Sequence, residues 1–393
     1  MPRDVKKIYK LNISYDWNIN DLKNRIKNVG GMLLSTTEGC NLRCKYCTYS
    51  EKYKNDDKKI KKLKNMDINT AKRAILNIKN LNPYSVFYVG FYGGECLQRI
   101  DFIKQCVSYV RSISHDESLS FGLTTNGLLL NEENRNYLRE NDFNVTVSLD
   151  GPEIIHDRYR VYGEEKSYAK IIEFLKAWKN EAPNYFNMHV SINSVLALPV
   201  IPYIIDDFFN DIKIEMSYSN LNMTSQFEEF LKLKKNDNLN DVLVSKQTDI
   251  KNYYNLYKKY IESELKEIHN PEDYVIKNFI PGGSCIPGGM KIYVDVDGNY
   301  YPCEKTDESM KYCIGNVDNG IDYQRAMNLY NDFVEHTKQK CVNCWAVRKC
   351  KICIKDTGRE INCARIKDQK RQDMIYYLEN INDDVNMKKI LNS

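Results

Sequence analysis

Apolar runs rich in β-branched and aromatic residues alternate along this chain with stretches that have helical periodicity. The apolar runs predict strands at about 30–37, 86–92, 120–125, 144–149, 187–195 and 213–218. The stretches between them predict helices within 68–81, 101–113, 132–141, 168–180 and 200–210. Six strand–helix units in series predict an α/β fold with a parallel sheet, either curled into a partial barrel or left open. In both cases functional residues gather at the carboxyl ends of the strands.

The remainder of the chain has a different pattern. Residues 219–272 are rich in Lys, Asn, Glu and Tyr and predict a helical connector that packs against the sheet domain. After it, "KIYVDVDGNYYPCE" predicts a short hairpin that leads into a cysteine-dense tail. We therefore predict five segments: an N-terminal extension (1–29), the strand–helix domain (30–218), the helical connector (219–272), a small cysteine-rich domain (273–370) and a C-terminal helix or tail (371–393).

Charge and hydropathy exclude several classes of partner. The 57 basic and 53 acidic residues are mixed along the sequence and leave a net charge of +4, so no basic surface for nucleic acid or an anionic membrane is predicted. The start, "MPRDVKKIYK", has no apolar run behind its basic residues, and the longest apolar run, "SVLALPVIPYII", is too short to span a bilayer. We therefore expect a cytoplasmic protein that binds neither nucleic acid nor membranes.

Thirteen cysteines in a chain without an export signal indicate metal binding rather than disulfides, because the cytosol keeps thiols reduced. Cys40, Cys44 and Cys47 form a C-x3-C-x2-C pattern directly after the first predicted strand. A structural zinc site takes four protein ligands, which these three cysteines do not supply. A [4Fe–4S] cluster held by three thiolates keeps one iron open for a substrate or cofactor. We therefore predict an open cluster here; a ferredoxin-like electron relay and a chance grouping are the alternatives.

Candidate cofactor-binding residues follow the next three predicted strands. They are Gly93, Gly94 and Glu95 in "FYGGE", Asn126 in "TTNG", and Ser148, Asp150 and Arg160 in "VSLDGPEIIHDRYR". Together with the cysteine motif, in which the aromatic Tyr46 precedes the last cysteine, they resemble the radical S-adenosylmethionine (SAM) enzymes over roughly residues 30–220. The resemblance implies a partial (β/α)6 barrel, similar to a TIM barrel, in which the open cluster binds SAM.

The resemblance also implies a role for each strand-end residue. The open iron chelates the amino and carboxylate groups of the methionine part of SAM, and Gly93 and Gly94 let the backbone approach the amino group. Glu95 orients that edge, and Arg160 is the candidate cation for the carboxylate, with an ordinary surface arginine as the alternative. Three residues meet the ribose hydroxyls or the carboxylate: Asn126, Ser148 and Asp150. An electron from the cluster then splits SAM into methionine and a 5′-deoxyadenosyl radical, which abstracts hydrogen from the substrate.

Two cysteines lie outside these motifs. Cys96 stands where many radical SAM enzymes have proline, and it is either a functional thiol beside the cofactor or a small buried residue. Cys106 belongs to an apolar helical stripe and is predicted to lie in the core.

The C-terminal region supplies eight cysteines: Cys285, Cys303, Cys313, Cys341, Cys344, Cys350, Cys353 and Cys363. Two C-x2-C pairs in isolation indicate a zinc knuckle. The preceding "YVDVDGNYYPCE" and "IGNV", however, resemble the twin-cluster domain called SPASM that many radical SAM enzymes with peptide substrates carry. That resemblance implies two auxiliary [4Fe–4S] clusters.

The implied ligands of the two auxiliary clusters are unequal in number. One cluster would use Cys341, Cys344, Cys350 and Cys363. The other would use Cys285, Cys303 and Cys353, with either Cys313 or a substrate thiolate in its fourth position. Only two residues separate Cys350 from Cys353, fewer than the usual spacing, which leaves their assignment between the clusters open.

These resemblances predict an anaerobic enzyme that installs a thioether or carbon–carbon crosslink in a ribosomally made precursor peptide. The alternatives are an anaerobic sulfatase maturase, which oxidises Cys or Ser to formylglycine, a peptide epimerase, and a zinc-ribbon binding module on an inert scaffold. An electron donor such as flavodoxin or ferredoxin is also implied. Only 39 residues precede Cys40, too few for a leader-binding winged-helix domain, so we expect leader recognition by a separate protein or by residues 219–272.

Overall fold

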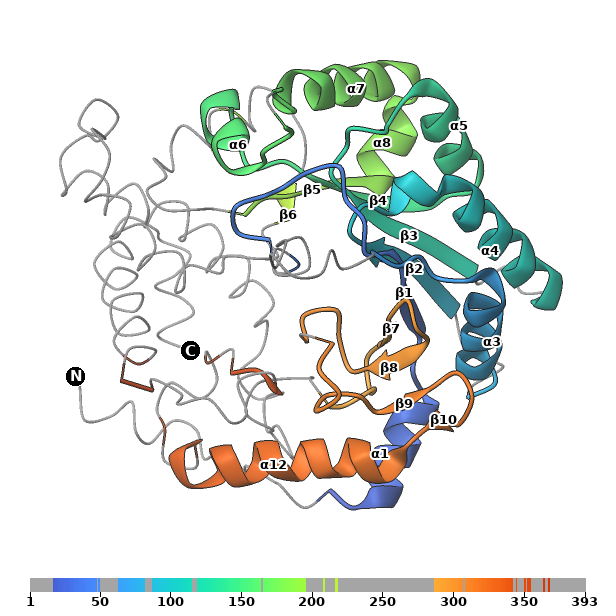
Figure 1. Ribbon diagram of the computed structural model, residues 1–393, viewed down its shortest axis with the longest axis vertical. Helices are drawn as coiled ribbons and strands as arrows, with labels where there is room; N and C mark the ends of the chain where they lie inside the picture. Colours follow the sequence, from blue (N-terminus) through green and yellow to red (C-terminus); the bar gives the residue numbers. More distant parts are fainter. Residues whose placement is uncertain are drawn as a thin grey trace, which may run out of the picture.

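The described strands of the computed structural model form a single sheet (Figure 1). The structure describes residues 17–47, 49, 63–81, 87–114, 119–163, 165–195, 208, 216–217, 286–306, 308–341, 344, 350, 352–354, 363–364 and 367. The strand order is β10-β9-β8-β7-β1-β2-β3-β4-β5-β6. The strands are β1 (Gly31–Thr37), β2 (Phe87–Gly93), β3 (Leu119–Thr125), β4 (Phe143–Ser148), β5 (Val190–Asn193), β6 (Met216–Ser217), β7 (Ile292–Val294), β8 (Asn299–Tyr301), β9 (Gly315–Asn316) and β10 (Gly320–Ile321).

Strands β1 to β6 pair in parallel and in chain order, which confirms the predicted α/β fold. Their alternating side chains separate two faces. In β2, Phe87, Val89 and Phe91 are buried under the helices, whereas Tyr88 and Tyr92 point to the opposite, concave face. Figure 1 shows α3, α4 and α5 covering the outer face of the curved sheet. The functional residues at the strand ends are therefore held on the inner side of a partial barrel.

The helices largely follow the predicted stretches. They are α1 (Ile19–Lys27), α3 (Ile68–Lys79), η2 (Cys96–Arg99), α4 (Ile100–Ile113), α5 (Glu132–Glu140), α6 (Glu153–Tyr159), α7 (Tyr168–Glu181), α8 (Pro183–His189) and α12 (Tyr323–Cys341). The predicted strand at 187–195 was wrong in its first residues, because Pro183 begins α8 and the strand starts only at Val190. The predicted helix at 200–210, apart from Phe208, and the segments 219–272 and 371–393 lie outside the described residues.

The predicted hairpin is confirmed, since β7 and β8 are antiparallel. Its turn closes where the Gly298 amide donates to the Asp295 carbonyl at 3.0 Å, and Gly298 has the positive φ of 85° that favours glycine. The hairpin was not expected to join the main sheet. Strand β7 nevertheless pairs in parallel with β1, so the C-terminal region extends the barrel sheet on the far side of β1.

Helices α1 and α12 were not predicted. Helix α1 begins with a capping box at Asn18 and buries Leu22 and Ile26. It packs against α12, which buries Tyr330 and ends at Cys341, the first cysteine of the tail. None of the helices in the described part of the chain has the length and apolar character needed to cross a membrane.

Candidate functional site

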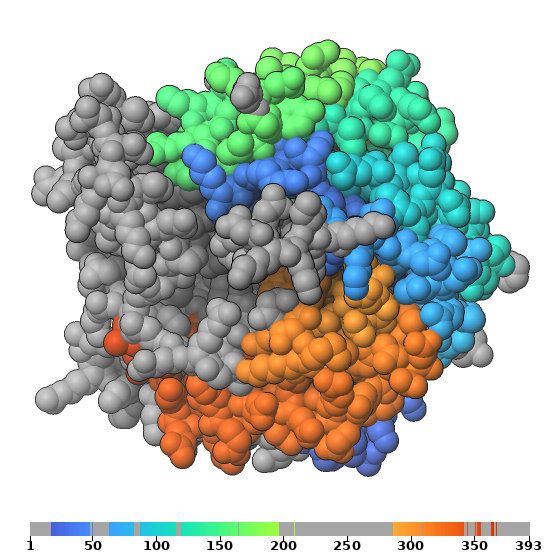
Figure 2. Space-filling model, in the orientation of Figure 1, coloured from blue at the N-terminus to red at the C-terminus, as the bar shows by residue number. Residues whose placement is uncertain are grey.

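The cysteine loop, defined as residues 38–47, follows β1 and is held by backbone contacts from both sides. In Figure 2 this part of the blue segment borders the green segment that contains α6. Four backbone hydrogen bonds join it to other segments: Glu38 N donates to Lys64 O (2.9 Å), Glu95 N to Gly39 O (2.8 Å), Lys45 N to Tyr159 O at the end of α6 (2.9 Å) and Arg43 N to Val161 O (2.8 Å). The loop therefore bridges the residues after β2 and the end of α6, which are distant in the sequence.

The three thiols of the loop share one half-buried environment. Burial raises the pKa of Cys40 and Cys47, and it raises that of Cys44 to about 11, with Cys47 and Cys40 adding to the rise at Cys44. The Arg160 guanidinium opposes this rise from 3.9 Å away. Thiolates so placed need a bound cation, and three soft ligands without a fourth fit an iron–sulfur cluster with an open position. Among the described residues, no His, Cys, Asp or Glu side chains gather closely enough to hold a single metal ion.

The glycine pair after β2 is required by close packing against the cysteine loop. Gly93 has φ 121°, and a Cβ there would lie 2.4 Å from the Thr37 carbonyl oxygen. A Cβ on Gly94 would lie 2.1 Å from the carbonyl oxygen of Gly39. Real Cβ atoms do not approach so closely, so any side chain here would push the cysteine loop outward. This packing requirement exists in addition to the cofactor contact that the sequence predicts.

Glu95 is 1% exposed and serves as the centre of a local network. Its carboxylate accepts from the amides of Leu97 (3.0 Å) and Asn126 (2.7 Å) and from the Thr125 hydroxyl (2.8 Å). Burial raises its pKa, and these three donors counteract the rise. Glu95 thereby joins the ends of β2 and β3.

Asn126 faces the cysteine loop from the end of β3. Its Nδ2 atom lies 2.7 Å from Asn41 Oδ1 and 3.8 Å from the Cys40 sulfur. The sequence pattern thus placed Asn126 at the correct strand end, and the fold brings it to the first cysteine. Ser148, at the end of β4, is 8% exposed.

Asp150 and Arg160 form a buried ion pair that supports the last part of the cysteine loop. The guanidinium donates through Nε (3.0 Å) and Nη2 (3.1 Å), and Asp150 also accepts from the Tyr46 hydroxyl and from the Val195 amide (3.0 Å). Asp150 is 0% and Arg160 6% exposed, so Arg160 is not a surface arginine. Although burial disfavours its charge, the Asp150 carboxylate raises the pKa of Arg160. The remaining Nη1 atom is the one directed toward Cys44.

His156 also belongs to the network around Asp150 and Arg160. It is 0% exposed, its Nδ1 atom lies 3.3 Å from the Asp150 amide, and its Nε2 atom lies 3.0 Å from the Ser167 hydroxyl. Burial and the Arg160 charge lower the pKa of His156 to about 4. A neutral imidazole therefore orients the strand end that carries Asp150.

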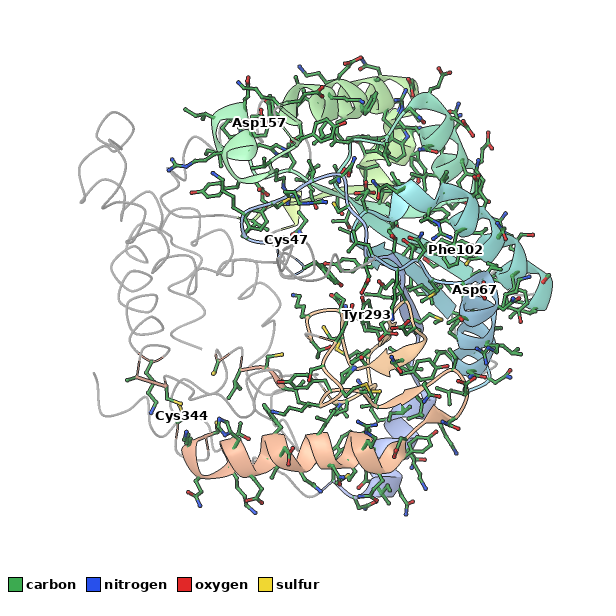
Figure 3. The ribbon with its side chains drawn as sticks, in the orientation of Figure 1. Cys47, Asp67, Phe102, Asp157, Tyr293 and Cys344 are labelled. Atoms are coloured by element: carbon green, nitrogen blue, oxygen red, sulfur yellow. The ribbon has the colours of Figure 1, made fainter. Side chains whose placement is uncertain are left out.

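Cys341 ends α12, and three further tail cysteines lie within electrostatic reach of it. Burial and, to a smaller extent, the thiols of Cys350, Cys344 and Cys363 raise the pKa of Cys341 to about 11. Figure 3 shows Cys344 well separated from Cys47. The four cysteines are those that the sequence assigned to one auxiliary cluster.

The other predicted auxiliary ligands are not brought together in the described part of the chain. Cys285 lies outside the described residues. Cys303 is half-buried beside Glu304, whose carboxylate pairs with Lys291 at 2.6 Å. Cys313 is 2% exposed, and its sulfur lies 3.2 Å from the Gly315 carbonyl oxygen, while Cys353 is half-buried.

Of the two cysteines outside the motifs, Cys106 is 0% exposed in the core, as predicted. Cys96 is 1% exposed, and its sulfur lies 3.3 Å from the Thr124 carbonyl oxygen. Both sulfurs are thus buried.

Sequence reasoning missed the tyrosines of the concave face. Tyr88 covers the backbone of β2 and β3, because a Cβ at Gly90 or Gly122 would meet its ring or hydroxyl within 3.0 Å. Burial and Glu304 raise the pKa of Tyr92, and the thiols of Cys47 and Cys303 contribute to that rise, so both sulfurs lie near this phenol. The alternation in "FYVGFYG" was a signal for these residues, since every second position shares a face.

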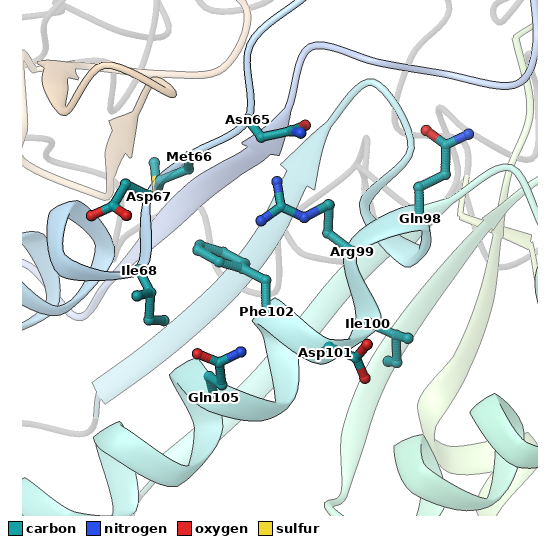
Figure 4. Close-up of a pocket in the computed structure, with 10 residues that line it drawn as sticks. All are labelled: Asn65, Met66, Asp67, Ile68, Gln98, Arg99, Ile100, Asp101, Phe102 and Gln105. Carbon is teal, nitrogen blue, oxygen red and sulfur yellow. The ribbon is translucent and has the colours of Figure 1, made fainter.

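A separate cavity of about 490 Å³ lies between the start of α3 and the η2–α4 segment (Figure 4). The Arg99 guanidinium points into it, stacked 5.3 Å from the Phe102 ring centroid, and its Nη1 atom has no hydrogen-bond partner. Asn65, on the cavity wall, accepts from the Thr37 hydroxyl at 2.6 Å. No cysteine lines this cavity, so it is distinct from the thiol site.

Comparison with known proteins identifies one family and several relatives. Residues 34–200 match the Radical SAM superfamily. A cysteine-type anaerobic sulfatase-maturating enzyme from Clostridium novyi (strain NT) is 24% identical over 336 residues, which cover 81% of this chain and 86% of the relative. The radical SAM cyclopropyl synthase TigE from Paramaledivibacter caminithermalis is 29% identical over 202 residues, 48% of this chain and 40% of TigE.

Solved structures share the fold. The structure of native anSMEcpe with bound AdoMet and Cp18Cys peptide has a TM-score of 0.61 and 18% identity, and the match covers 90% of this chain and 98% of that chain. Native anSMEcpe with bound AdoMet alone gives the same TM-score and covers 100% of that chain.

Proposed function

Because residues 34–200 form a domain of the radical SAM superfamily, we propose that this enzyme cleaves SAM reductively and uses the radical to modify a peptide. The observation that carries the proposal is the cysteine loop, which presents three thiols in a C-x3-C-x2-C pattern directly after β1. When bound there, a [4Fe–4S] cluster supplies the electron for SAM cleavage. The protein contributes the binding surface and the polar concave face.

The residues around the loop suit distinct tasks in this reaction. Gly93 and Gly94 have no side chains, so the backbone there can contact the cofactor while it packs on the cysteine loop. Asn126 and Ser148 lie at strand ends where they can meet the cofactor ribose or carboxylate. Arg160 offers its Nη1 atom, the only guanidinium nitrogen that Asp150 does not engage. We assign Glu95 and Asp150 to positioning, because their buried oxygens already accept several protein donors.

A peptide is the substrate class that the relatives support. The sulfatase-maturating relative covers most of this chain, and the anSMEcpe structure with a bound peptide shares its fold. Cys341, with three tail cysteines within electrostatic reach, suits one auxiliary cluster. A second cluster that includes Cys303 is implied by the sequence pattern alone. Such clusters would take up the electron that remains after hydrogen abstraction. A flavodoxin or ferredoxin as electron donor, and a separate leader-binding protein, belong to the same proposal.

For the product we favour a thioether or carbon–carbon crosslink in a precursor peptide. The supporting observation is Cys313, whose buried sulfur is directed at the Gly315 carbonyl. With Cys313 so engaged, a second auxiliary cluster would be held by three cysteines, and its open position would suit a substrate thiolate. A thioether would form as the carbon radical joins the sulfur while the thiol proton and one electron leave, and such a cluster would be the acceptor of that electron. Overall the peptide loses two hydrogen atoms.

Formylglycine formation on a Cys or Ser side chain is the second candidate. It is favoured by the sulfatase-maturating relative, whose similarity extends over 81% of this chain rather than over the SAM-binding domain alone. Both candidates begin with the same hydrogen abstraction. They differ in whether the radical carbon is captured by sulfur or becomes a carbonyl.

Two measurements test the proposal. Anaerobic reconstitution should give a brown protein with iron and sulfide for three clusters; a colourless protein containing zinc would identify a zinc-binding module instead. Incubation with SAM, dithionite and short peptides encoded beside the gene should yield 5′-deoxyadenosine and a modified peptide. A peptide that has lost two hydrogens, retains all its sulfur and does not react with a hydrazine is crosslinked, whereas a product that reacts with a hydrazine carries formylglycine, from Ser if its sulfur is retained and from Cys if one sulfur is lost. An iron-loaded protein that forms no deoxyadenosine would refute the proposed function.

A further inference from the structure

Three side chains from three separate segments form a hydrogen-bonded series on the concave face, which we call the phenol chain: Tyr49, Tyr293 and Glu308. The Tyr49 and Tyr293 hydroxyl oxygens lie 3.0 Å apart, and Tyr293 donates to Glu308 Oε1 at 2.7 Å. Tyr49 follows Cys47 by two residues, and Glu308 follows Cys303 by five. The phenol chain therefore links the segment after the cysteine loop to the segment after Cys303.

Tyr293 is suited to a bridging position. It is 0% exposed on β7, and β7 pairs with β1, the strand that leads directly into the cysteine loop. Figure 3 shows Tyr293 on the hairpin that faces the part of the molecule containing Cys47. The pairing of β7 with β1 thus holds the Tyr293 hydroxyl in place independently of its hydrogen bonds to Tyr49 and Glu308.

Glu308 has a strained backbone that this contact helps to hold. Its φ is 55°, a value that non-glycine residues rarely adopt. The Tyr293 hydroxyl engages its carboxylate, and the Tyr301 hydroxyl donates to its carbonyl oxygen at 2.9 Å. Strained residues persist when their surroundings determine their conformation, and here two buried tyrosines do so.

The segments that contain Cys47 and Cys303 are close enough for the distance between them to affect the reaction. Tyr92 lies within electrostatic reach of the thiols of both Cys47 and Cys303. A shift of about 1 Å between reacting groups is sufficient to reduce a rate by roughly 100-fold. An element that sets this spacing therefore affects the reaction without touching the reacting atoms.

We propose that Tyr293 is a positioning residue that sets the Cys303 segment relative to the cysteine loop through the phenol chain. Its consequence for peptide modification rests on the proposed function, but the positioning itself is a property of the fold. Each hydrogen bond contributes about 1 kcal/mol, enough to favour one arrangement of two segments about fivefold. Loss of the Tyr293 hydroxyl releases both segments at once.

Tyr300 provides a matched control. It is also a fully buried tyrosine of the same hairpin, and its hydroxyl accepts from Asn77 Nδ2 at 3.1 Å. It points to the helix-covered face, toward α3, and not to the concave face. A Tyr300→Phe variant therefore removes a buried hydroxyl of similar surroundings without interrupting the phenol chain.

The test is hydrogen–deuterium exchange on the full-length, cluster-loaded protein without peptide. In Tyr293→Phe, amides of residues 38–49 and of 303–308 should both exchange about tenfold faster, whereas Tyr300→Phe should leave both segments unchanged. Glu308→Gln retains an acceptor oxygen and should behave as the wild type, and Glu308→Ala should resemble Tyr293→Phe. Unchanged exchange at 38–49 in Tyr293→Phe, or equal effects of the two phenylalanine variants, would overturn the proposal.

SAM cleavage is measured in the same samples with dithionite as reductant. Wild-type protein that forms no deoxyadenosine, yet shows the expected exchange pattern, removes the proposed function and leaves the positioning role standing. Deoxyadenosine formation together with unchanged exchange in Tyr293→Phe removes the positioning role and leaves the proposed function standing. The two conclusions therefore fail separately.

Discussion

The cysteine loop and the cysteine tail present thiols in two different ways. The loop is surrounded by strand ends, by four backbone hydrogen bonds and by the buried pair of Asp150 and Arg160. The tail site begins at the end of α12 and, in the part that the structure describes, is anchored by the buried side chains of Ile352 and Ile354. The comparison indicates that the fold itself positions the thiols of the cysteine loop through contacts from several distant segments.

Removal of the loop thiols should have the largest effect. Replacing Cys40, Cys44 and Cys47 together by Ala should abolish 5′-deoxyadenosine formation and remove one cluster's share of iron, since no other described residue offers a ligand there. Iron analysis and chromatography of the anaerobic reaction provide the measurement. Residual SAM cleavage by the triple variant would show that the catalytic cluster lies elsewhere.

Removal of a tail thiol should separate the role of the tail cysteines from the role of the cysteine loop. A Cys341→Ala variant should still cleave SAM, because its sulfur belongs to the group at the end of α12 and not to the loop. Product should fall at least tenfold, since an electron acceptor for the last step is lost. The ratio of deoxyadenosine to modified peptide is the measurement. Full product formation by a soluble variant that keeps the other two clusters would contradict a redox role for the tail.

Disruption of the buried ion pair should test whether the fold positions the loop. Asp150→Asn leaves the Arg160 charge buried without its partner, and we expect a loss of about 3–5 kcal/mol in the free energy of unfolding. Glu181→Gln is the control, because Glu181 pairs with Arg135 but is itself 39% exposed, so its loss should matter less. Chemical denaturation of both variants gives the comparison, and equal losses would argue against a special role for Asp150.

Protonation of His156 should have the smallest effect. Its pKa is lowered to about 4 in the folded protein from an ordinary value of 6.5, so the unfolded chain binds more protons between these values. The free energy of unfolding should therefore fall as the pH decreases from about 6.5 to about 4. His156→Asn should reduce this slope in urea titrations. A slope that is identical in the variant would assign the pH dependence to other groups.

The amino-acid sequence by itself determined most of the strand–helix domain. Apolar, β-rich runs that alternate with helical stretches predicted the six strands, and strand–helix units in series predicted their parallel order. Local motifs predicted which candidate functional residues lie at the strand ends. These motifs are the spacing of Cys40, Cys44 and Cys47 and the positions of Gly93, Gly94 and Asn126. These features are local, so they can be recognised without knowledge of distant contacts.

Only the tertiary structure decided which distant groups meet. It paired β7 with β1, which no local pattern specifies because the two strands are separated by more than half of the chain. It buried both oxygens of Asp150 among donors from Tyr46, Arg160 and Val195, a network that the sequence did not predict. It also formed the phenol chain, whose members are polar residues of three segments and carry no shared sequence signal. Such contacts depend on how the sheet curves, which is a property of the whole fold.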